Sequence, residues 1–141
     1  MFRFSLLIVF AIIKIKILMV KEKIDGKWSL PGGWADIGYT PSEIAVKETQ
    51  EEAGMEVKAG RLLAVLDKRC HKHPQDIYYI YKIFIECQYL GEAQSDFAET
   101  TDARFFSHDA IPPLSTPRNT QEQIDYMFEF NAGKRTNPII D

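Results

Sequence analysis

The chain has 141 residues, of which 45% are hydrophobic and 26% charged, and this suits one domain with a real core. Its formal net charge of −3 offers no attraction to nucleic acid or to anionic lipid, so we expect neither as a partner. An acidic protein that handles a polyanion must bind cations locally, which favours a metal. The two cysteines, Cys70 and Cys87, form no paired motif, which predicts free thiols in a reducing compartment, the cytoplasm.

Residues 6–13 form an apolar run of eight that is followed by Lys14 and Lys16. A membrane-spanning helix needs about 20 apolar residues, so this run is too short, and Lys-Ile-Lys is a poor cleavage site for a signal peptide. We therefore predict a buried strand here and a second strand over residues 15–23. No clear turn separates them, so residues 1–20 are an atypical, strand-like start, either native or truncated.

The clearest helix start in the sequence is at Thr40. Thr40 offers an N-cap hydroxyl, Pro41 fixes φ at the first helical position, and Glu43 completes a capping box. We expect the helix to end at Ala53, because Gly54 can adopt the left-handed conformation that stops a helix.

The remaining elements follow from β-type runs, turn residues and one further capping box. In chain order, we expect a turn at 25–26, strands at 28–30, 62–67, 77–88 and 103–106, loops at 36–39, 70–76 and 91–101, a rigid connector at 111–114, a helix at 121–130 capped by Thr120 and Gln123, and a loose tail over about 133–141. Strands thus lie before, between and after the helices. This order predicts an α/β fold in which helices cover a mixed sheet.

Three glutamates gather on one face of the first helix. At about 100° per residue, Glu48, Glu51 and Glu52 fall within a sector of roughly 100°. The opposite side can pack on a sheet and carries Ala45, Val46, Thr49 and Ala53. Ile44 falls near the acidic sector, so it either covers the edge of a site or points into a neighbouring loop.

Carboxylates placed this closely repel one another, by roughly 0.8 kcal/mol per pair at about 5 Å in bulk water. One interpretation is a solvated acidic face whose repulsion is offset by Lys47. The other is a Mg²⁺ site, because Mg²⁺ prefers a few carboxylates together with waters and phosphate oxygens. Gly32 and Gly33 precede the helix by a short loop and let the backbone approach a ligand closely. The two features together favour one pocket.

Residues 33–55 resemble the Nudix box, whose pattern is glycine, five residues, glutamate, seven residues and then R-E-U-x-E-E-x-G-U, with U aliphatic. The matching positions are Gly33, Glu48, Glu51, Glu52, Gly54 and Met55. The resemblance covers nearly the whole chain. It implies the Nudix fold, an α/β/α sandwich around a central mixed β-sheet, as a single domain over 1–141.

Three positions depart from this pattern. Tyr39 stands where the first glutamate belongs, Lys47 replaces the arginine, and Thr49 replaces an aliphatic residue. Tyr39 removes one acidic contributor, and Lys47 keeps a positive charge without the planar fork of arginine. We expect Thr49 to be tolerated, whereas Tyr39 and Lys47 favour an alternative function, a Nudix-like module that binds or senses a nucleotide without cutting it.

The resemblance implies hydrolysis of a nucleoside diphosphate linked to another group, with Mg²⁺ or Mn²⁺ as the cofactor. It assigns the metal to Glu48, Glu51 and Glu52, and the catalytic base to Glu51, Glu52 or an outside carboxylate. Glu99 is our candidate for the outside carboxylate, with an ordinary loop glutamate as the alternative.

Further residues are candidates for substrate contacts. Gly32, Gly33 and Lys47 would bind or orient phosphate, while Trp34 and His73 are weaker substrate candidates. Tyr78, Tyr79 and Tyr81 could stack on a base, with sheet packing as the alternative for them and for Trp34.

Residues 25–36 look like those of Nudix hydrolases that carry an extra N-terminal helical domain, such as CDP-choline and ADP-ribose pyrophosphatases. No such domain fits before Lys21, so either it is absent or the start is not the native one. The resemblance implies a CDP-choline-like or ADP-ribose-like substrate and a homodimer. RNA processing is disfavoured, because Lys and Arg are scattered and form no basic path.

Overall fold

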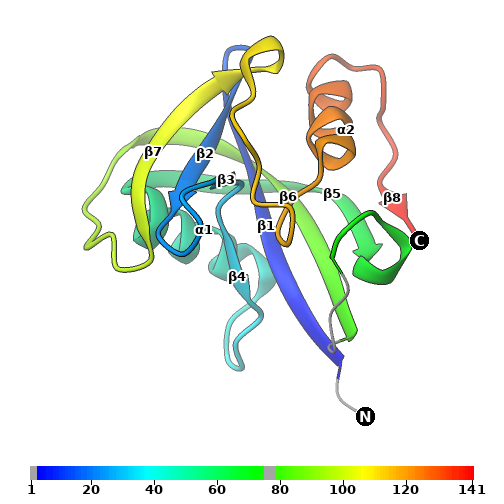
Figure 1. Cartoon of the computed structure of the whole chain (residues 1–141), viewed down its shortest axis with the longest axis horizontal. Helices are drawn as coiled ribbons and strands as arrows, with labels where there is room; N and C mark the ends of the chain where they lie inside the picture. The colour runs from blue at the N-terminus through cyan, green and yellow to red at the C-terminus, as the bar shows by residue number, and fades with distance from the viewer. Residues whose placement is uncertain (1–2, 75–78) are drawn as a thin grey trace.

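The computed structural model describes residues 3–74 and 79–141 (Figure 1). Its strands in the described residues are β1 (Arg3–Ile13), β2 (Lys16–Glu22), β3 (Trp28–Ser29), β4 (Gly32–Trp34), β5 (Met55–Asp67), β6 (Tyr79–Glu92), β7 (Thr100–Ser107) and β8 (Ile139–Ile140). The α-helices are α1 (Pro41–Ala53) and α2 (Gln121–Asn131), and short 3₁₀ turns cover Lys68–Cys70 and His108–Ala110. The predicted start of a strand at residue 77 and the candidate Tyr78 lie outside the described residues.

The strands form one mixed sheet, with the order β3-β2-β1-β6-β5-β8. Strand β4 also pairs with β1, and β7 with β2. The β1–β6 and β5–β8 pairs are parallel, and the other strand pairs are antiparallel. The predicted α/β fold with a mixed sheet is therefore confirmed.

The apolar run in β1 is explained by burial on both faces of the sheet. Leu7 and Val9 belong to a core cluster that includes buried residues of α1, whereas Ile8 and Phe10 belong to a second cluster with residues of α2. Since side chains alternate along a strand, α1 and α2 cover opposite faces (Figure 1). This arrangement is the predicted three-layer sandwich.

Helix α1 begins and ends as its sequence predicts. The Thr40 hydroxyl accepts a hydrogen bond from the Glu43 N–H at 3.1 Å, and the Glu43 carboxylate accepts one from the Thr40 N–H at 3.1 Å. Gly54 ends the helix with φ of 64°. Ile44, however, is only 2% exposed and packs in the core with Leu7, so it neither covers the edge of a site nor points into a loop.

Two backbone features at the N-terminal half were not predicted. Lys14 takes a φ of 56° and turns the chain between β1 and β2, although it is not a glycine. The diglycine segment is strand β4, which pairs with β1 at Leu7↔Gly33 and Ile8↔Gly32. A Cβ atom added at Gly32 would lie 2.3 Å from the Leu7 carbonyl oxygen, so this pairing requires glycine.

The C-terminal end differs from the predicted loose tail. Strand β8 pairs in parallel with β5, and the Asp141 carboxylate accepts a hydrogen bond from the Asp67 N–H at 2.9 Å. The predicted strand at 62–67 is the C-terminal half of the longer β5, and the predicted strand at 103–106 lies within the longer β7. In the residues that the structure describes, no helix is long and apolar enough to cross a membrane.

Candidate active site

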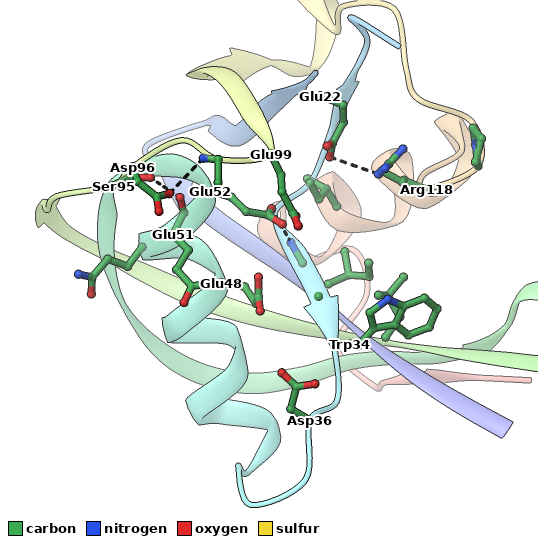
Figure 2. Close-up of a pocket in the computed structure, with 18 of the residues that line it drawn as sticks. Glu22, Trp34, Asp36, Glu48, Glu51, Glu52, Ser95, Asp96, Glu99 and Arg118 are labelled. Carbon is green, nitrogen blue, oxygen red and sulfur yellow. Dashed lines mark hydrogen bonds and ion pairs between the residues drawn. The ribbon is translucent and has the colours of Figure 1, made fainter. Parts of the chain in front are cut away.

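A pocket of about 1000 Å³ opens beside α1 and β4 (Figure 2). Its described lining carries seven carboxylates, those of Glu22, Asp36, Glu48, Glu51, Glu52, Asp96 and Glu99, and two basic side chains, those of Lys68 and Arg118. Figure 2 shows the carboxylates of Glu48, Glu52 and Glu99 turned toward the middle of the pocket. The pocket is strongly anionic, so a polyanion can bind only where cations offset this charge.

Strand β4 comes close enough to α1 to fix two of the helix glutamates. The Gly32 N–H donates a hydrogen bond to the Glu52 carboxylate at 3.2 Å. At Gly33, an added Cβ would lie 2.5 Å from the Glu48 carboxyl carbon, so any larger residue would displace that carboxylate. The predicted phosphate-binding glycines therefore lie against the acidic helix and orient its side chains.

Burial and mutual repulsion make the two inner glutamates hard to ionise. Burial raises the pKa of Glu52 to about 9, an effect opposed by the Gly32 N–H and increased by Glu22, Glu48 and Glu99. Burial also raises the pKa of Glu48 to about 7, and the nearby Glu51 carboxylate adds to this. Such uncompensated carboxyl groups in a pocket are typical of functional sites.

The two main departures from the Nudix box are in contact with each other. The Lys47 ammonium lies 5.3 Å from the centre of the Tyr39 ring, within the range of a cation–π interaction. It also lies 3.8 Å from Glu51 and 3.9 Å from Glu48, and Glu51 is the main cause of its raised pKa. Lys47 and Tyr39 line a second hollow, which shares Gln50 and Glu51 of α1 with the first, so Lys47 lies at the edge of the acidic face.

The residues fit a divalent cation by charge and donor type. Among the described residues, no three His, Cys, Asp or Glu side chains are grouped as a ready-made metal cage. Mg²⁺ does not require such a cage, because it commonly uses one or two carboxylates together with waters and substrate phosphates. The half-buried carboxyl oxygens of Glu48 and Glu52 meet this need, and a bound cation would offset the burial and the repulsion that raise their pKa values.

The other predicted residues are dispersed over the site and its surroundings. Glu99 lines the pocket, and its charge contributes to the raised pKa values of Glu48 and Glu52. Trp34 also lines it, is 48% exposed and makes an edge contact with Phe4 at 5.6 Å between ring centres.

His73 and two of the tyrosines lie elsewhere in the described structure. His73 is not among the described lining residues, because its Nδ1 contacts the Thr116 carbonyl at 2.7 Å and its Nε2 faces the Lys82 ammonium at 3.3 Å. Tyr79 and Tyr81 lie on β6 outside this lining, whereas Ile80 between them lines the pocket.

Glu22 and Arg118 were missed by sequence reasoning. Glu22 ends β2, is 7% exposed and accepts a hydrogen bond from the Ser29 hydroxyl at 2.6 Å. Arg118 precedes α2 and lies 3.3 Å from the Glu22 carboxylate. A charged residue within a buried strand is the one local signal that could have indicated Glu22. No local pattern distinguishes Arg118.

The NUDIX domain model matches residues 4–129. "Putative ADP-ribose pyrophosphatase YjhB" of Bacillus subtilis (strain 168) is 48% identical over 126 residues, which are 89% of this chain and 61% of that protein. This chain therefore spans about three-fifths of the length of that curated relative.

Two solved structures are similar over the whole chain. An ADP-ribose pyrophosphatase from Streptococcus suis 89-1591 has a TM-score of 0.88 and 36% identity, covering 99% of this chain and all of that one. A UDP-X diphosphatase has a TM-score of 0.85 and 32% identity, covering 100% of this chain and 68% of that one.

The fold, the acidic helix beside its diglycine strand and these matches agree, and this chain belongs to the NUDIX domain family. The resemblance found in the sequence is therefore confirmed. The expected link to relatives with an extra N-terminal domain is not confirmed by these comparisons.

Proposed function

We propose that this protein hydrolyses the diphosphate bond of a nucleoside diphosphate linked to another group, using Mg²⁺ or Mn²⁺. The observation that carries this proposal is the pair of half-buried carboxyl groups of Glu48 and Glu52, which lie beside β4 in an acidic pocket. The relatives named ADP-ribose pyrophosphatase and UDP-X diphosphatase support a substrate of this class, with ADP-ribose-like compounds first.

Glu48, Glu51 and Glu52 are the residues that would hold the cation. Such a cation would supply neutralisation of the diphosphate charge and would make the attacking water more acidic. The Gly32 N–H holds Glu52 by a hydrogen bond. The carboxyl group of Glu48 occupies the space that a side chain at position 33 would fill. Lys47 restrains the outer face by its contacts with Glu48 and Glu51.

The reaction also needs a base to accept a proton from the attacking water. As water adds to one phosphorus, the anhydride P–O bond breaks and the second phosphate leaves with its electron pair. Glu51, Glu52 and Glu99 all line the pocket and are the candidates for this base. Glu99 comes from the loop before β7, so it reaches the pocket independently of the helix (Figure 2).

The nucleoside would lie against the apolar part of the pocket. Trp34 offers an exposed ring there, and Leu6 and Ile80 extend this surface. We retain Trp34 as a substrate contact and assign His73 to the buried polar cluster around Lys82 instead.

A cytoplasmic homodimer completes the proposal. Cys70 and Cys87 are both free, which agrees with a reducing compartment. Leu62 and Ile140 expose apolar surface that a second copy could cover, at 43% and 76% exposure.

The test is a hydrolysis assay with ADP-ribose, a UDP-sugar, CDP-choline and 8-oxo-dGTP in the presence of Mg²⁺. We expect release of a mononucleotide from at least one diphosphate-linked compound, and its loss in Glu52→Gln. Glu56→Gln is the matched control, because Glu56 is exposed on β5 and outside the described pocket lining. Tight binding without turnover would instead support the nucleotide-sensing alternative that Tyr39 and Lys47 favour.

A further inference from the structure

The wall of the pocket that faces α1 is formed in part by the segment before α2. Pro117 and Arg118 of this segment line the pocket, and Arg118 supplies the one guanidinium in the described lining. Figure 2 shows Arg118 reaching toward Glu22 from the side opposite to α1. A positive group therefore stands across the pocket from the acidic helix.

The guanidinium of Arg118 is held in a defined orientation. Its Nε lies 3.3 Å from the Glu22 carboxylate, and its Nη1 donates a hydrogen bond to the Ser115 hydroxyl at 3.0 Å. Ser115 in turn donates to the Asp25 carboxylate at 2.7 Å. The side chain of Arg118 is still 37% exposed, and a guanidinium carries five N–H donors in all. The oriented guanidinium of Arg118 can thus donate hydrogen bonds to a ligand in the pocket.

The backbone that carries Arg118 is anchored from the protein interior. The buried ammonium of Lys82 donates a hydrogen bond to the Arg118 carbonyl. The side-chain oxygen of Asn119 accepts a hydrogen bond from the Leu30 N–H at 2.7 Å, and Asn119 is fully buried. Binding by Arg118 would therefore require little ordering of its main chain, which lowers the entropic cost of binding.

Glu22 does not depend on Arg118 alone. The Ser29 hydroxyl donates a hydrogen bond to it at 2.6 Å, in a buried position. When an anion enters, Arg118 can turn part of its fork toward it without leaving the Glu22 carboxylate unpaired. Arginine matches phosphate oxygens in planar, bidentate geometry, and it does so better than lysine.

We propose that Arg118 binds the diphosphate of the substrate from the wall opposite α1, by hydrogen bonds to non-bridging oxygens. This inference rests on the proposed function, since it takes a diphosphate as the ligand. The carboxylates on the α1 side leave the anion dependent on cations there, whereas Arg118 attracts it directly. The recognised feature is the diphosphate, so an uncharged nucleoside gains nothing from Arg118.

The test is calorimetric titration, in Mg²⁺, with two probes that cannot be hydrolysed, α,β-methylene-ADP and methylenediphosphonate. For Arg118→Ala, we expect the affinity for both probes to fall by roughly 10- to 100-fold, the size of a lost charge-assisted hydrogen bond. Arg118→Lys should recover part of this loss, because it keeps the charge without the fork. Arg104→Ala is the matched control, since Arg104 pairs with Asp102 on β7 outside the described lining.

Three results would overturn the inference. Unchanged affinity of Arg118→Ala for both probes would show that Arg118 does not contact the ligand. Failure of the wild type to bind either probe would show that the pocket does not bind a diphosphate. Weaker binding of α,β-methylene-ADP alone would place Arg118 at the nucleoside instead. The proposed function fails separately: a wild type that binds both probes through Arg118 yet hydrolyses no diphosphate-linked nucleotide supports the inference and refutes the enzyme.

Discussion

Two buried polar clusters lie close together in this protein, and they differ in how their charges are compensated. Around Lys82, the ammonium donates to the Arg118 carbonyl and to the Gln123 side-chain oxygen at 2.9 Å, and His73 contacts both side chains. Around Glu52, carboxylates face other carboxylates, and the Gly32 N–H is the described hydrogen-bond donor to that side chain.

The contrast separates a structural role from a functional one. Burying a polar group is costly unless it finds partners, and the Lys82 cluster supplies them from within the chain. The acidic cluster leaves its charges to be balanced by something that binds, which is what a cation-dependent site requires. Removing a hydrogen-bond partner at Lys82 should therefore reduce stability, whereas removing the carboxyl group at Glu52 should reduce activity.

The largest expected effect is at Glu52. Glu52→Gln should lower kcat for ADP-ribose hydrolysis by about 10²- to 10⁴-fold, the range expected when a catalytic acid–base or metal-holding group is lost. The thermal midpoint without metal should stay unchanged or rise, because glutamine removes a carboxyl group whose raised pKa makes its burial unfavourable near neutral pH. Steady-state kinetics and thermal unfolding in EDTA, with Glu56→Gln alongside, check both parts. A large loss of stability would show that Glu52 has a structural role, like Lys82.

A change in geometry at Gly33 should have the next largest effect. Gly33→Ala places a Cβ about 2.5 Å from the Glu48 carboxyl carbon, so that carboxylate must move. We expect kcat/KM to fall by roughly 10²-fold, because misplacement by about 1 Å is enough for such a loss. Gly91→Ala is a partial control: an added Cβ meets nothing within 4 Å there, although the φ of 155° is unfavourable for alanine. Full activity of Gly33→Ala would show that the Glu48 position does not matter.

At Lys82, the expected effect is on stability. Lys82→Met would leave the Arg118 carbonyl without this donor and would remove one of the two hydrogen bonds to the Gln123 oxygen, which still accepts from the Thr120 N–H. We expect the free energy of unfolding to fall by about 1–2 kcal/mol, since a stranded acceptor costs roughly 1–3 kcal/mol, while the unfavourable burial of the amine is removed. Denaturant unfolding measures this, and Lys16→Met at an exposed position of β2 is the control. An unchanged midpoint would contradict the structural role.

His73 should give the smallest effect, as a dependence of stability on pH. Burial, and then the charge of Lys82, lower its pKa from 6.5 to about 4. Between these values the unfolded chain holds a proton that the folded ring does not, so stability should decrease as the pH falls from 6.5 to 4. Thermal unfolding across this range should show a smaller decrease in His73→Gln. Identical profiles would place the acid sensitivity at other groups.

The sequence was sufficient for the parts that depend on local signals. Helix α1 could be bounded from Thr40, Pro41, Glu43 and Gly54, since a capping box and a left-handed glycine act within a few residues. The spacing of its glutamates likewise indicated the acidic face, because helical periodicity alone brings them to one side. Ile44 was misplaced because this periodicity does not say how far the core extends around a helix.

Features that depend on distant parts of the chain could not be predicted in this way. Strand β8 exists because β5 offers it an edge, and residues 133–141 alone carry no strong strand pattern. Glu22 and Arg118 meet only after β2 and the segment before α2 are brought together by the sheet and by Lys82. Because the two residues lie far apart in the sequence, their positions show no regular spacing from which the contact could be predicted.

The most direct test is anomalous diffraction from crystals of the wild-type protein soaked in Mn²⁺. We predict a peak within bonding distance of the carboxylates of Glu48 and Glu52, lost at that position in Glu52→Gln. A soaked crystal with no peak beside these residues, from protein that still hydrolyses ADP-ribose, would contradict the assignment of the acidic helix as the metal site.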